Sequence, residues 1–316
     1  MSKTQTLFHQ LAEKISHVVF GQSVLINQLL IALLSGGHVI LEGVPGTGKT
    51  LTVKVLAKLL QAEFRRIQLT PDIMPSDILG TNIFDLNTRK FVLKKGPVFT
   101  QILLTDEINR TPPKTQAALL EAMEERQVTL DGESLPLSEL FWTIATQNSL
   151  EFEGTYPLPE AQLDRFLFKL IVNYPDPASE KQMLLGSHTG RSTRYNDLSE
   201  LEPIATVEQC LQAQREVRAI NVHESVIDYL LALVERTRRH SDLLIGASPR
   251  AAVAWLLASK ASAWLAEREF VTPDDIKAVA SPLLRHRLIL RPEAQLDGLS
   301  IEPVIQSLLS QVPVPR

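Results

Sequence analysis

The chain has 316 residues, of which 44% are hydrophobic and 22% charged, and at roughly 150 residues per domain this length predicts about two domains. Its 32 basic and 36 acidic residues give a net charge of −4, which excludes a bulk basic field for nucleic acid but not a local basic patch. The single cysteine, Cys210, excludes an internal disulfide and a cysteine-based zinc site.

Neither a membrane span nor a secretory signal is expected. The longest unbroken apolar run, residues 251–258, is far shorter than the ~18 residues that a span requires. Residues 1–20 carry charged and histidine side chains inside their apolar pattern, so they contain no signal-peptide h-region. We therefore expect a cytoplasmic protein.

The first 175 residues alternate helical patterns with short apolar strands. Apolar residues at helical spacing predict helices at about residues 7–18, 24–34 and 49–60. Short apolar runs predict five strands, at about residues 38–42, 64–69, 101–105, 140–146 and 166–172. This alternation is typical of an α/β fold in which a mainly parallel sheet is covered on both faces.

Two β-hairpins are expected to project from this core. Residues 83–93 form two β-like arms around Asn87, Thr88 and Arg89, and residues 127–137 contain Asp131-Gly132, a hairpin turn signal. After residue 175 the pattern changes, because Pro175 and Pro177 mark a boundary and only helical periodicity follows. We predict a core domain at residues 1–175 and an all-helical domain at residues 176–316.

A phosphate-binding loop is the most specific motif in the chain. Residues 43–50 match G-x-x-x-x-G-K-[ST] between an expected strand and an expected helix. In such a loop the backbone N–H groups and the helix dipole hold phosphate, the lysine reaches the β- and γ-phosphates, and the hydroxyl can bind Mg²⁺. The predicted nucleotide-binding residues are Gly43, Pro45, Gly46, Thr47, Gly48, Lys49, Thr50 and Leu51.

A pair of carboxylates ends the strand expected at residues 101–105. Because parallel strands bring their carboxyl ends to one edge of the sheet, Asp106 is expected beside the phosphate loop. Asp106 would hold Mg²⁺ together with Thr50, and Glu107 would polarise the attacking water as general base. No Asn-Lys-x-Asp guanine signature occurs, which favours ATP over GTP.

Three further polar residues become functional candidates only together. Asn148, just past a strand, is either a turn residue or a ligand for the γ-phosphate or the attacking water. Arg165, before the last strand, is either a salt-bridged surface residue or an arginine finger for a neighbouring subunit's γ-phosphate. Arg250 is either an ordinary first-turn arginine or a residue with which the second domain senses bound nucleotide.

This arrangement is similar to that of AAA+ ATPases, and more specifically it resembles the MoxR family. The matching stretches are residues 21–22, 68–72, 75–77, 80, 96–97, 106–110, 112–116, 119–125, 145–148, 154–166 and 246–250. The resemblance implies a three-layer P-loop NTPase core with a five-stranded sheet and a helical lid. It also implies ATP hydrolysis in rings, usually hexameric, and chaperone-like remodelling or maturation of protein partners. Such partners often carry a von Willebrand factor A-type domain, and some relatives help insert metal cofactors.

By position in the family's motifs, the resemblance also assigns roles to individual residues. They are Lys49 and Thr50 (Walker A), Asp106 and Glu107 (Walker B), Asn148 (sensor 1), Arg165 (arginine finger), Arg250 (sensor 2), and the region around Val19–Gln22, with Gly21 and Gln22 (adenine side). The hairpin at residues 83–93 corresponds to the family's helix-2 insert, and the hairpin at residues 127–137 corresponds to the one that precedes sensor 1. The cleft between core and lid is the expected nucleotide site, with ATP or ADP and Mg²⁺ as ligands.

Two other functions stay open at this point. One is a nucleic-acid-dependent motor, because relatives with the same first insert include helicases. The first hairpin is mildly basic but no aromatic stacking pair accompanies its basic residues, and the net charge is negative, so this function is less favoured. The other is a nucleotide-gated binding module in which hydrolysis only resets an assembly state.

Overall fold

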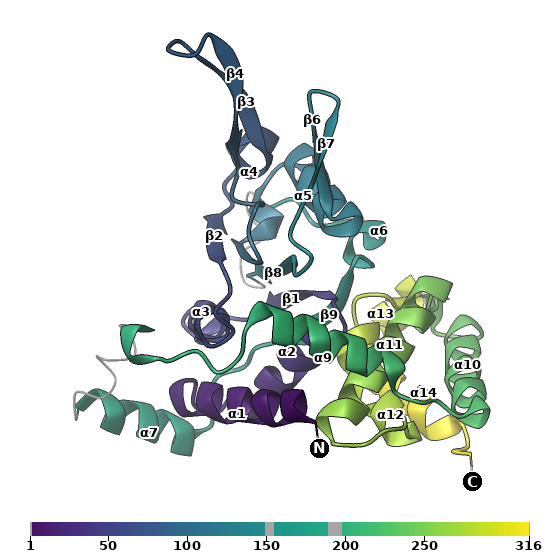
Figure 1. Ribbon diagram of the computed structural model, residues 1–316. Coiled ribbons are helices and arrows are strands. Elements are labelled where there is room, and N and C mark those ends of the chain that lie inside the picture. Colours follow the sequence, from purple (N-terminus) through teal and green to yellow (C-terminus); the bar gives the residue numbers. More distant parts are fainter. Residues whose placement is uncertain (1, 149–154, 189–197, 316) are drawn as a thin grey trace.

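The computed structural model describes residues 2–148, 155–188 and 198–315 (Figure 1). Its centre is a five-stranded parallel sheet with strand order β2-β5-β8-β1-β9. The strands are β1 (His38–Glu42), β2 (Phe64–Gln68), β5 (Ile102–Asp106), β8 (Trp142–Gln147) and β9 (Phe166–Ile171). The predicted α/β core with five strands is therefore confirmed, and each strand lies within one or two residues of its expected position.

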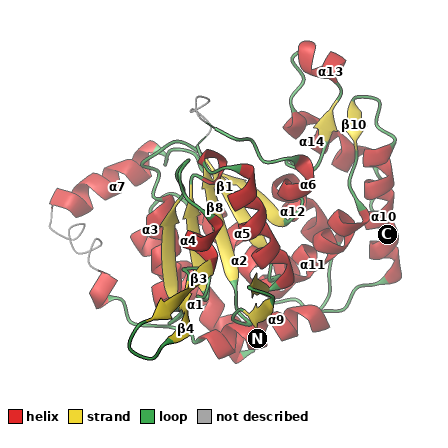
Figure 2. Ribbon diagram, turned by 90° about the horizontal axis from the view of Figure 1, so that it is seen from above, coloured by secondary structure: helices red, strands yellow, loops and turns green. Residues whose placement is uncertain are grey.

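Helices cover both faces of the sheet and make three layers (Figure 2). Successive side chains of a strand point to opposite faces, so Val39 joins one buried cluster and Ile40 the other. The first cluster is built with α1 (Lys3–Val18), α2 (Ser23–Leu34) and α3 (Lys49–Leu59). The second is built with α4 (Pro75–Leu79) and α5 (Pro113–Glu125).

Two antiparallel hairpins project from the same end of this core (Figure 1). They are formed by β3 (Gly80–Asp85) with β4 (Lys90–Lys95), and by β6 (Gln127–Leu130) with β7 (Glu133–Pro136). In the β3–β4 hairpin Phe84 is paired with Phe91, and their rings lie edge to face with centroids 5.4 Å apart. The expectation that this hairpin lacks an aromatic pair was therefore wrong.

Where the structure describes it, the C-terminal region is helical apart from one small two-stranded sheet and an isolated bridge between Asn221 and Phe270. Its elements are α7 (Pro177–His188), η2 (Leu198–Glu200), α9 (Val207–Ala219), α10 (Glu224–Arg238), α11 (Pro249–Leu265), α12 (Pro273–Leu284), α13 (Pro292–Leu296) and α14 (Ile301–Gln311). The strands β10 (Leu243–Ile245) and β11 (Ile289–Leu290) pair antiparallel, which corrects the expectation of helices alone. Strands of two and three residues are too short to produce a readable alternation.

The C-terminal helices pack against one flank of the core. Helix α11 contacts α2 and α9, and α12 contacts the edge strand β9. Leu33 of α2, Phe168 of β9 and Trp255 of α11 belong to one continuous buried cluster. These helices therefore share a hydrophobic core with the sheet layer. Among the described residues, no helix is both long and apolar enough to cross a membrane.

Candidate active site

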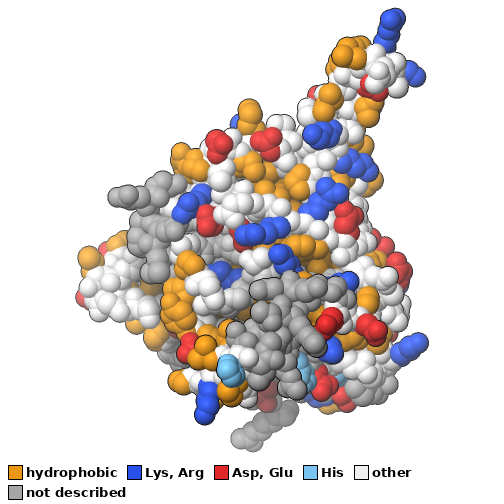
Figure 3. All heavy atoms as spheres, turned by 90° about the vertical axis from the view of Figure 1, so that its left-hand side faces the viewer, with side chains coloured by type: hydrophobic (Ala, Val, Ile, Leu, Met, Phe, Trp, Pro, Cys, Tyr) orange, Lys and Arg blue, Asp and Glu red, His pale blue; other side chains and the backbone are white. Residues whose placement is uncertain are grey.

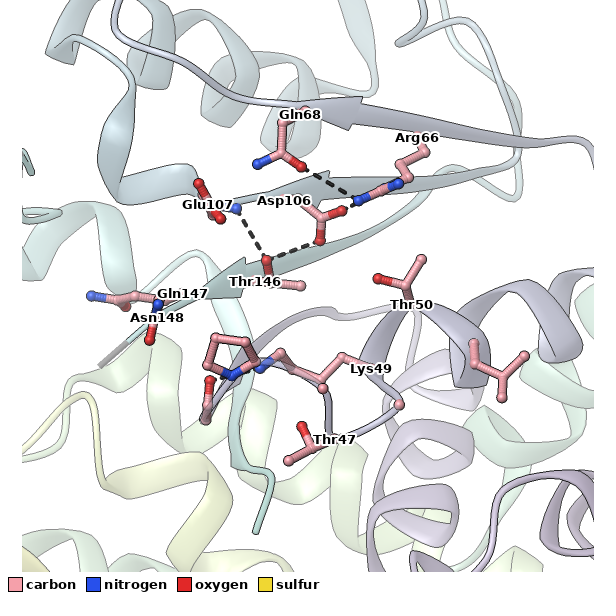
Figure 4. A pocket seen from close by; sticks show the side chains of 15 residues that line it. Thr47, Lys49, Thr50, Arg66, Gln68, Asp106, Glu107, Thr146, Gln147 and Asn148 are labelled. Atoms are coloured by element: carbon pink, nitrogen blue, oxygen red, sulfur yellow. Dashed lines mark hydrogen bonds and ion pairs between the residues drawn. The ribbon is translucent and has the colours of Figure 1, made fainter. Parts of the chain in front are cut away.

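The predicted phosphate loop connects β1 to α3, and its glycines are required by its geometry (Figure 4). Gly46 and Gly48 both have φ of +82°, a left-handed conformation that side chains disfavour. A Cβ on Gly43 would lie 2.3 Å from the carbonyl oxygen of Val172, so this glycine lets the loop approach the end of β9. The loop therefore has the backbone shape that directs N–H groups at a phosphate.

A cavity of about 420 Å³ opens above this loop. The residues that line it are Gly43, Pro45, Gly46, Thr47, Gly48, Lys49, Thr50, Leu51, Arg66, Gln68, Asp106, Glu107, Thr146, Gln147 and Asn148. The loop, the carboxylate pair and Asn148 thus meet at the carboxyl edge of the sheet, where open α/β sheets bind ligands. Four of these lining residues were not predicted from the sequence as part of the site: Arg66, Gln68, Thr146 and Gln147.

Lys49 is held inside this cavity by its own loop. Its Nζ donates hydrogen bonds to the carbonyl oxygens of Gly43 (2.6 Å) and Val44 (2.8 Å). Burial lowers the pKa of Lys49, while the nearby Asp106 carboxylate opposes that shift. An anion that binds here would both replace these carbonyls as partners and favour the ammonium form.

Asp106 is buried and fixed from two sides. Thr146 on β8 donates a hydrogen bond from Oγ1 to Asp106 Oδ1 at 3.0 Å. Arg66 on β2 donates from Nε to Asp106 Oδ2 at 2.6 Å. Strand β5 lies between β2 and β8, so both partners come from its neighbours in the sheet. The carboxylate is thereby oriented before any ligand binds.

Glu107 follows in a strained backbone conformation, with φ of +60°. Its N–H donates to Thr146 Oγ1 at 3.0 Å, so one hydroxyl ties both acidic residues to β8. Its carboxylate Oε2 lies 2.9 Å from Arg110 Nε in η1 (Ile108–Arg110). This turn holds Glu107 in the lining of the cavity, which is the position required of a general base that activates water there.

The donor set fits Mg²⁺ together with a phosphate. The Thr50 hydroxyl and the Asp106 carboxylate line the same cavity, and a hydroxyl with a carboxylate is the oxygen chemistry that Mg²⁺ prefers. Such sites usually complete the magnesium shell with substrate phosphates and water rather than with further protein groups. The glycines leave open space, because a Cβ on Gly46 or Gly48 would meet no atom within 4 Å.

A second, largely apolar cavity of about 520 Å³ adjoins the same loop. It is lined by Val18, Val19, Phe20, Gly46, Thr47, Gly48, Leu51, Tyr174, Pro175, Glu180, Met183 and Leu184. Gly46, Thr47 and Gly48 of the loop and Leu51 of α3 line both cavities, so a base here would be continuous with phosphates in the first.

Gly21 and Gln22, predicted on the adenine side, follow Val18, Val19 and Phe20 in the sequence but are not among the residues that line this apolar cavity. Gln22 Nε2 donates to the carbonyl oxygen of Asn173 at 3.0 Å. Gly21 has φ of +71°, and a Cβ there would lie 2.8 Å from Ser179. These two residues therefore hold the turn between α1 and α2 against the segment that precedes and begins α7, while the side chains of residues 18–20 face the cavity.

Arg165 and Arg250 lie apart from the phosphate cavity and meet at a common partner. Arg165 Nε is 2.8 Å from Glu124 Oε2, and Arg250 Nη1 is 2.9 Å from Glu124 Oε1. Both arginines line a cavity of about 230 Å³ that contains no phosphate-loop residue. Arg250 therefore lies away from the phosphate cavity in this arrangement, and the sensing of bound nucleotide by Arg250 stays a prediction. Glu124, at the end of α5, was not predicted as a site residue.

Comparison with known proteins identifies the chain. It is 40% identical to "Chaperone MoxR1" of Mycobacterium tuberculosis, over 96% of this chain and 81% of that protein. The chain belongs to the MoxR family of AAA+ ATPases. It is also 44% identical to YeaC of Bacillus subtilis over 98% of this chain and 95% of that protein. "Protein MoxR" of Methylorubrum extorquens is 31% identical over 96% and 93% of the two chains.

Family and structural matches agree with this assignment. Residues 38–168 match the "ATPase family associated with various cellular activities (AAA)", and residues 235–308 match an "AAA lid domain". A solved structure of an ATPase candidate from Cytophaga hutchinsonii superposes with a TM-score of 0.91 at 40% identity, covering 99% of this chain and 96% of that one. The protein is thus a nucleotide-binding AAA+ ATPase with a lid, and the predicted enzyme class is confirmed.

Proposed function

We propose that this MoxR-family ATPase works as an oligomeric ring in which each nucleotide is completed by two arginines from the adjacent subunit. The observation that carries the proposal is the position of Arg165 and Arg250, which meet at Glu124 outside the phosphate cavity of their own chain. Their side chains are 29% and 49% exposed, so both can reach a second molecule. A hexamer is the ring size that the family resemblance implies.

In this proposal the chemistry within one chain is carried by the phosphate cavity. Lys49 and the loop amides bind the β- and γ-phosphates of ATP. Thr50 and Asp106 hold Mg²⁺, which neutralises phosphate charge when bound. Glu107 accepts the proton of the attacking water, and Asn148 orients that water or the γ-phosphate. Arg165 of the adjacent subunit stabilises the charge that develops in the transition state.

We further propose that the product of this cycle is the remodelling of a protein partner. The β3–β4 hairpin stands out from the body and exposes apolar side chains (Figure 3). Phe91 is 73% exposed and Leu86 81% exposed, and Ile83 and Val92 are exposed on the opposite face of the hairpin. Aliphatic side chains favour a protein surface over phosphates or bases. A partner with a von Willebrand factor A-type domain, or an enzyme that takes up a metal cofactor, is the class that the family implies.

The Phe84–Phe91 pair, next to Arg89 and Lys90, keeps a nucleic-acid motor as the second candidate. Aromatic faces and cations together can bind single strands without sequence preference. DNA that binds in a salt-sensitive manner and raises the ATPase rate would favour this function over protein remodelling. An unchanged ATPase rate across DNA concentrations would remove it.

Subunit mixing tests the inter-subunit site directly. Lys49→Ala should inactivate a subunit's own nucleotide site but leave the arginines that it supplies to its neighbour. Arg165→Ala should leave the subunit's own site intact but remove the arginine that it supplies to its neighbour. Each variant alone should hydrolyse ATP at under 5% of the wild-type rate, and a mixture should recover several times more than either. Arg236→Ala, an exposed lid arginine bonded to Gln311, is the matched control and should retain full activity. Full activity of Arg165→Ala alone would overturn the inter-subunit site.

A further inference from the structure

Arg287 lies at the junction between the lid and the core and is nearly inaccessible to solvent. It follows α12 in the lid, and its side chain is only 4% exposed. Burial lowers the pKa of this guanidinium, whereas hydrogen bonding to Asp164 raises it. Burial of a charge is costly unless every polar group is satisfied. The arrangement of its partners therefore decides what this residue does.

Every N–H of the Arg287 guanidinium has an acceptor. Nε donates to Asp164 Oδ1 at 2.6 Å, and Nη2 donates to the carbonyl oxygens of Asp164 (3.2 Å) and Phe166 (2.7 Å). Nη1 donates to the carbonyl oxygen of Leu167 at 2.9 Å and to that of Leu283 in α12. Arginine has five N–H donors, and four of the five bonds reach residues 164–167 of the core.

The residue in the middle of that segment is Arg165. Arg287 thus binds the backbone immediately before and after Arg165 and leaves the Arg165 side chain to Glu124. A second lid element contacts the same place, because Ser248, the N-cap of α11, donates from Oγ to Asp164 Oδ2 at 3.4 Å. Arg250 lies two residues after Ser248. Two parts of the lid therefore hydrogen-bond to the segment that contains Arg165.

We infer that Arg287 is a positioning residue that sets the place of Arg165 at the subunit boundary, so that the lid of one subunit controls hydrolysis in the next. The inference rests on the proposed function. A displacement of α12 is transmitted to residues 164–167 because four hydrogen bonds in one rigid, planar group must move together. The role is one of geometry, and Arg287 itself contacts no reacting atom.

Arg287→Lys is the informative substitution because it keeps the positive charge and removes the planar guanidinium with its five N–H donors. A lysine ammonium has three donors and cannot span the five acceptors around Arg287. Arg285→Lys is the matched control in the same run of residues. Arg285 donates to the carbonyl oxygen of Lys169 and pairs with Glu302, so it joins lid to core without contacting residues 164–167.

The experiment uses mixed rings with Arg165→Ala as the subunit that hydrolyses. Its partner is Lys49→Ala with the native lid, or Lys49→Ala combined with Arg287→Lys or with Arg285→Lys. We expect the Arg287→Lys partner to restore at least fivefold less activity than the other two, with a lower kcat and an unchanged KM for ATP. The Arg287→Lys single variant should bind a fluorescent ATP analogue in its own site like the wild type.

Equal restoration by the Arg287→Lys and Arg285→Lys partners would overturn the inference. If even the Lys49→Ala partner with a native lid restores nothing, the inter-subunit site itself fails, which is a different outcome. Asp164→Asn provides a second route if Arg287→Lys does not fold, because it keeps all backbone acceptors and weakens only the two side-chain bonds that the carboxylate accepts, from Arg287 and from Ser248. A Lys49→Ala partner that also carries Asp164→Asn should restore less ATPase activity than Lys49→Ala alone, although the loss should be smaller than with Arg287→Lys. Full restoration by this folded partner would overturn the inference.

Discussion

Replacement of Thr146 by valine should test whether one hydroxyl organises both acidic residues of the active site. Thr146 Oγ1 accepts from the Glu107 N–H and donates to Asp106 Oδ1, each at 3.0 Å, and the residue is 5% exposed. Valine has nearly the same shape and removes both bonds. The substitution therefore leaves a partly buried N–H without its acceptor and removes one bond from a buried carboxylate.

The cost can be worked out from these two bonds. An orphaned donor costs about 1–3 kcal/mol, and a hydrogen bond to a charged group contributes about 1.5–3 kcal/mol. The two bonds share one hydroxyl and are not additive, and the new methyl group gains some apolar burial. We expect the free energy of unfolding to fall by ~2 kcal/mol. We also expect kcat for ATP to fall about tenfold, equivalent to roughly 1.4 kcal/mol in the barrier.

Urea unfolding measures the first quantity, provided that the m-value stays unchanged. The same strand offers a matched control, since Thr143 is fully buried and its hydroxyl has no hydrogen-bond partner among the described residues. Thr143→Val should leave the protein unchanged or stabilise it by up to about 1 kcal/mol. Equal unfolding free energies for the two variants would refute the reasoning, as would full ATPase activity of Thr146→Val.

Three other outcomes follow from the described residues. Glu107→Gln should bind ATP and release phosphate at least a hundredfold more slowly, as measured with radiolabelled ATP; rapid turnover would remove Glu107 as the base. Burial raises the pKa of Cys210 to about 12, so its thiol should react with a chromogenic disulfide only after denaturation. Burial lowers the pKa of His38 from 6.5 to about 4, so the unfolded chain takes up this proton first as the pH falls. The free energy of unfolding should then decrease from about pH 6.5 towards pH 4, by up to about 1.4 kcal/mol per pH unit for this group. His38→Gln should flatten that slope, and an unchanged slope in urea titrations at several pH values would contradict it.

The strands and the phosphate loop were predictable because their signals are local. Apolar runs locate the five strands, and the loop motif requires only eight consecutive residues, 43–50. The roles of Arg66 and Thr146 were not predictable, because they depend on strand order. Arg66 reaches Asp106 only because β2 pairs with β5 in the sheet, and the sequence of residues 64–68 does not indicate which strand pairs with β2.

The Phe84–Phe91 pair was missed through the register of the hairpin. A turn centred on Thr88 would place Phe84 opposite Val92, whereas the observed turn at residues 86–89 places it opposite Phe91. A shift of one residue moves a side chain to the other face. Glu124 was missed for another reason: the end of α5 meets α11 only after the lid has packed on α2 and β9.

The exposed turn of the β3–β4 hairpin also contains a site at which trypsin can cleave the chain. The turn ends at Arg89, and Lys90 follows, so trypsin should cut there before it reaches the packed core. The resulting fragments, 1–89 and 90–316, would stay together, because the sheet interleaves β2 and β1 of the first with β5, β8 and β9 of the second. The phosphate loop would lie on one fragment and the acidic pair on the other. The nicked protein would be a split ATPase, and the rate of nicking would report whether a partner covers the turn.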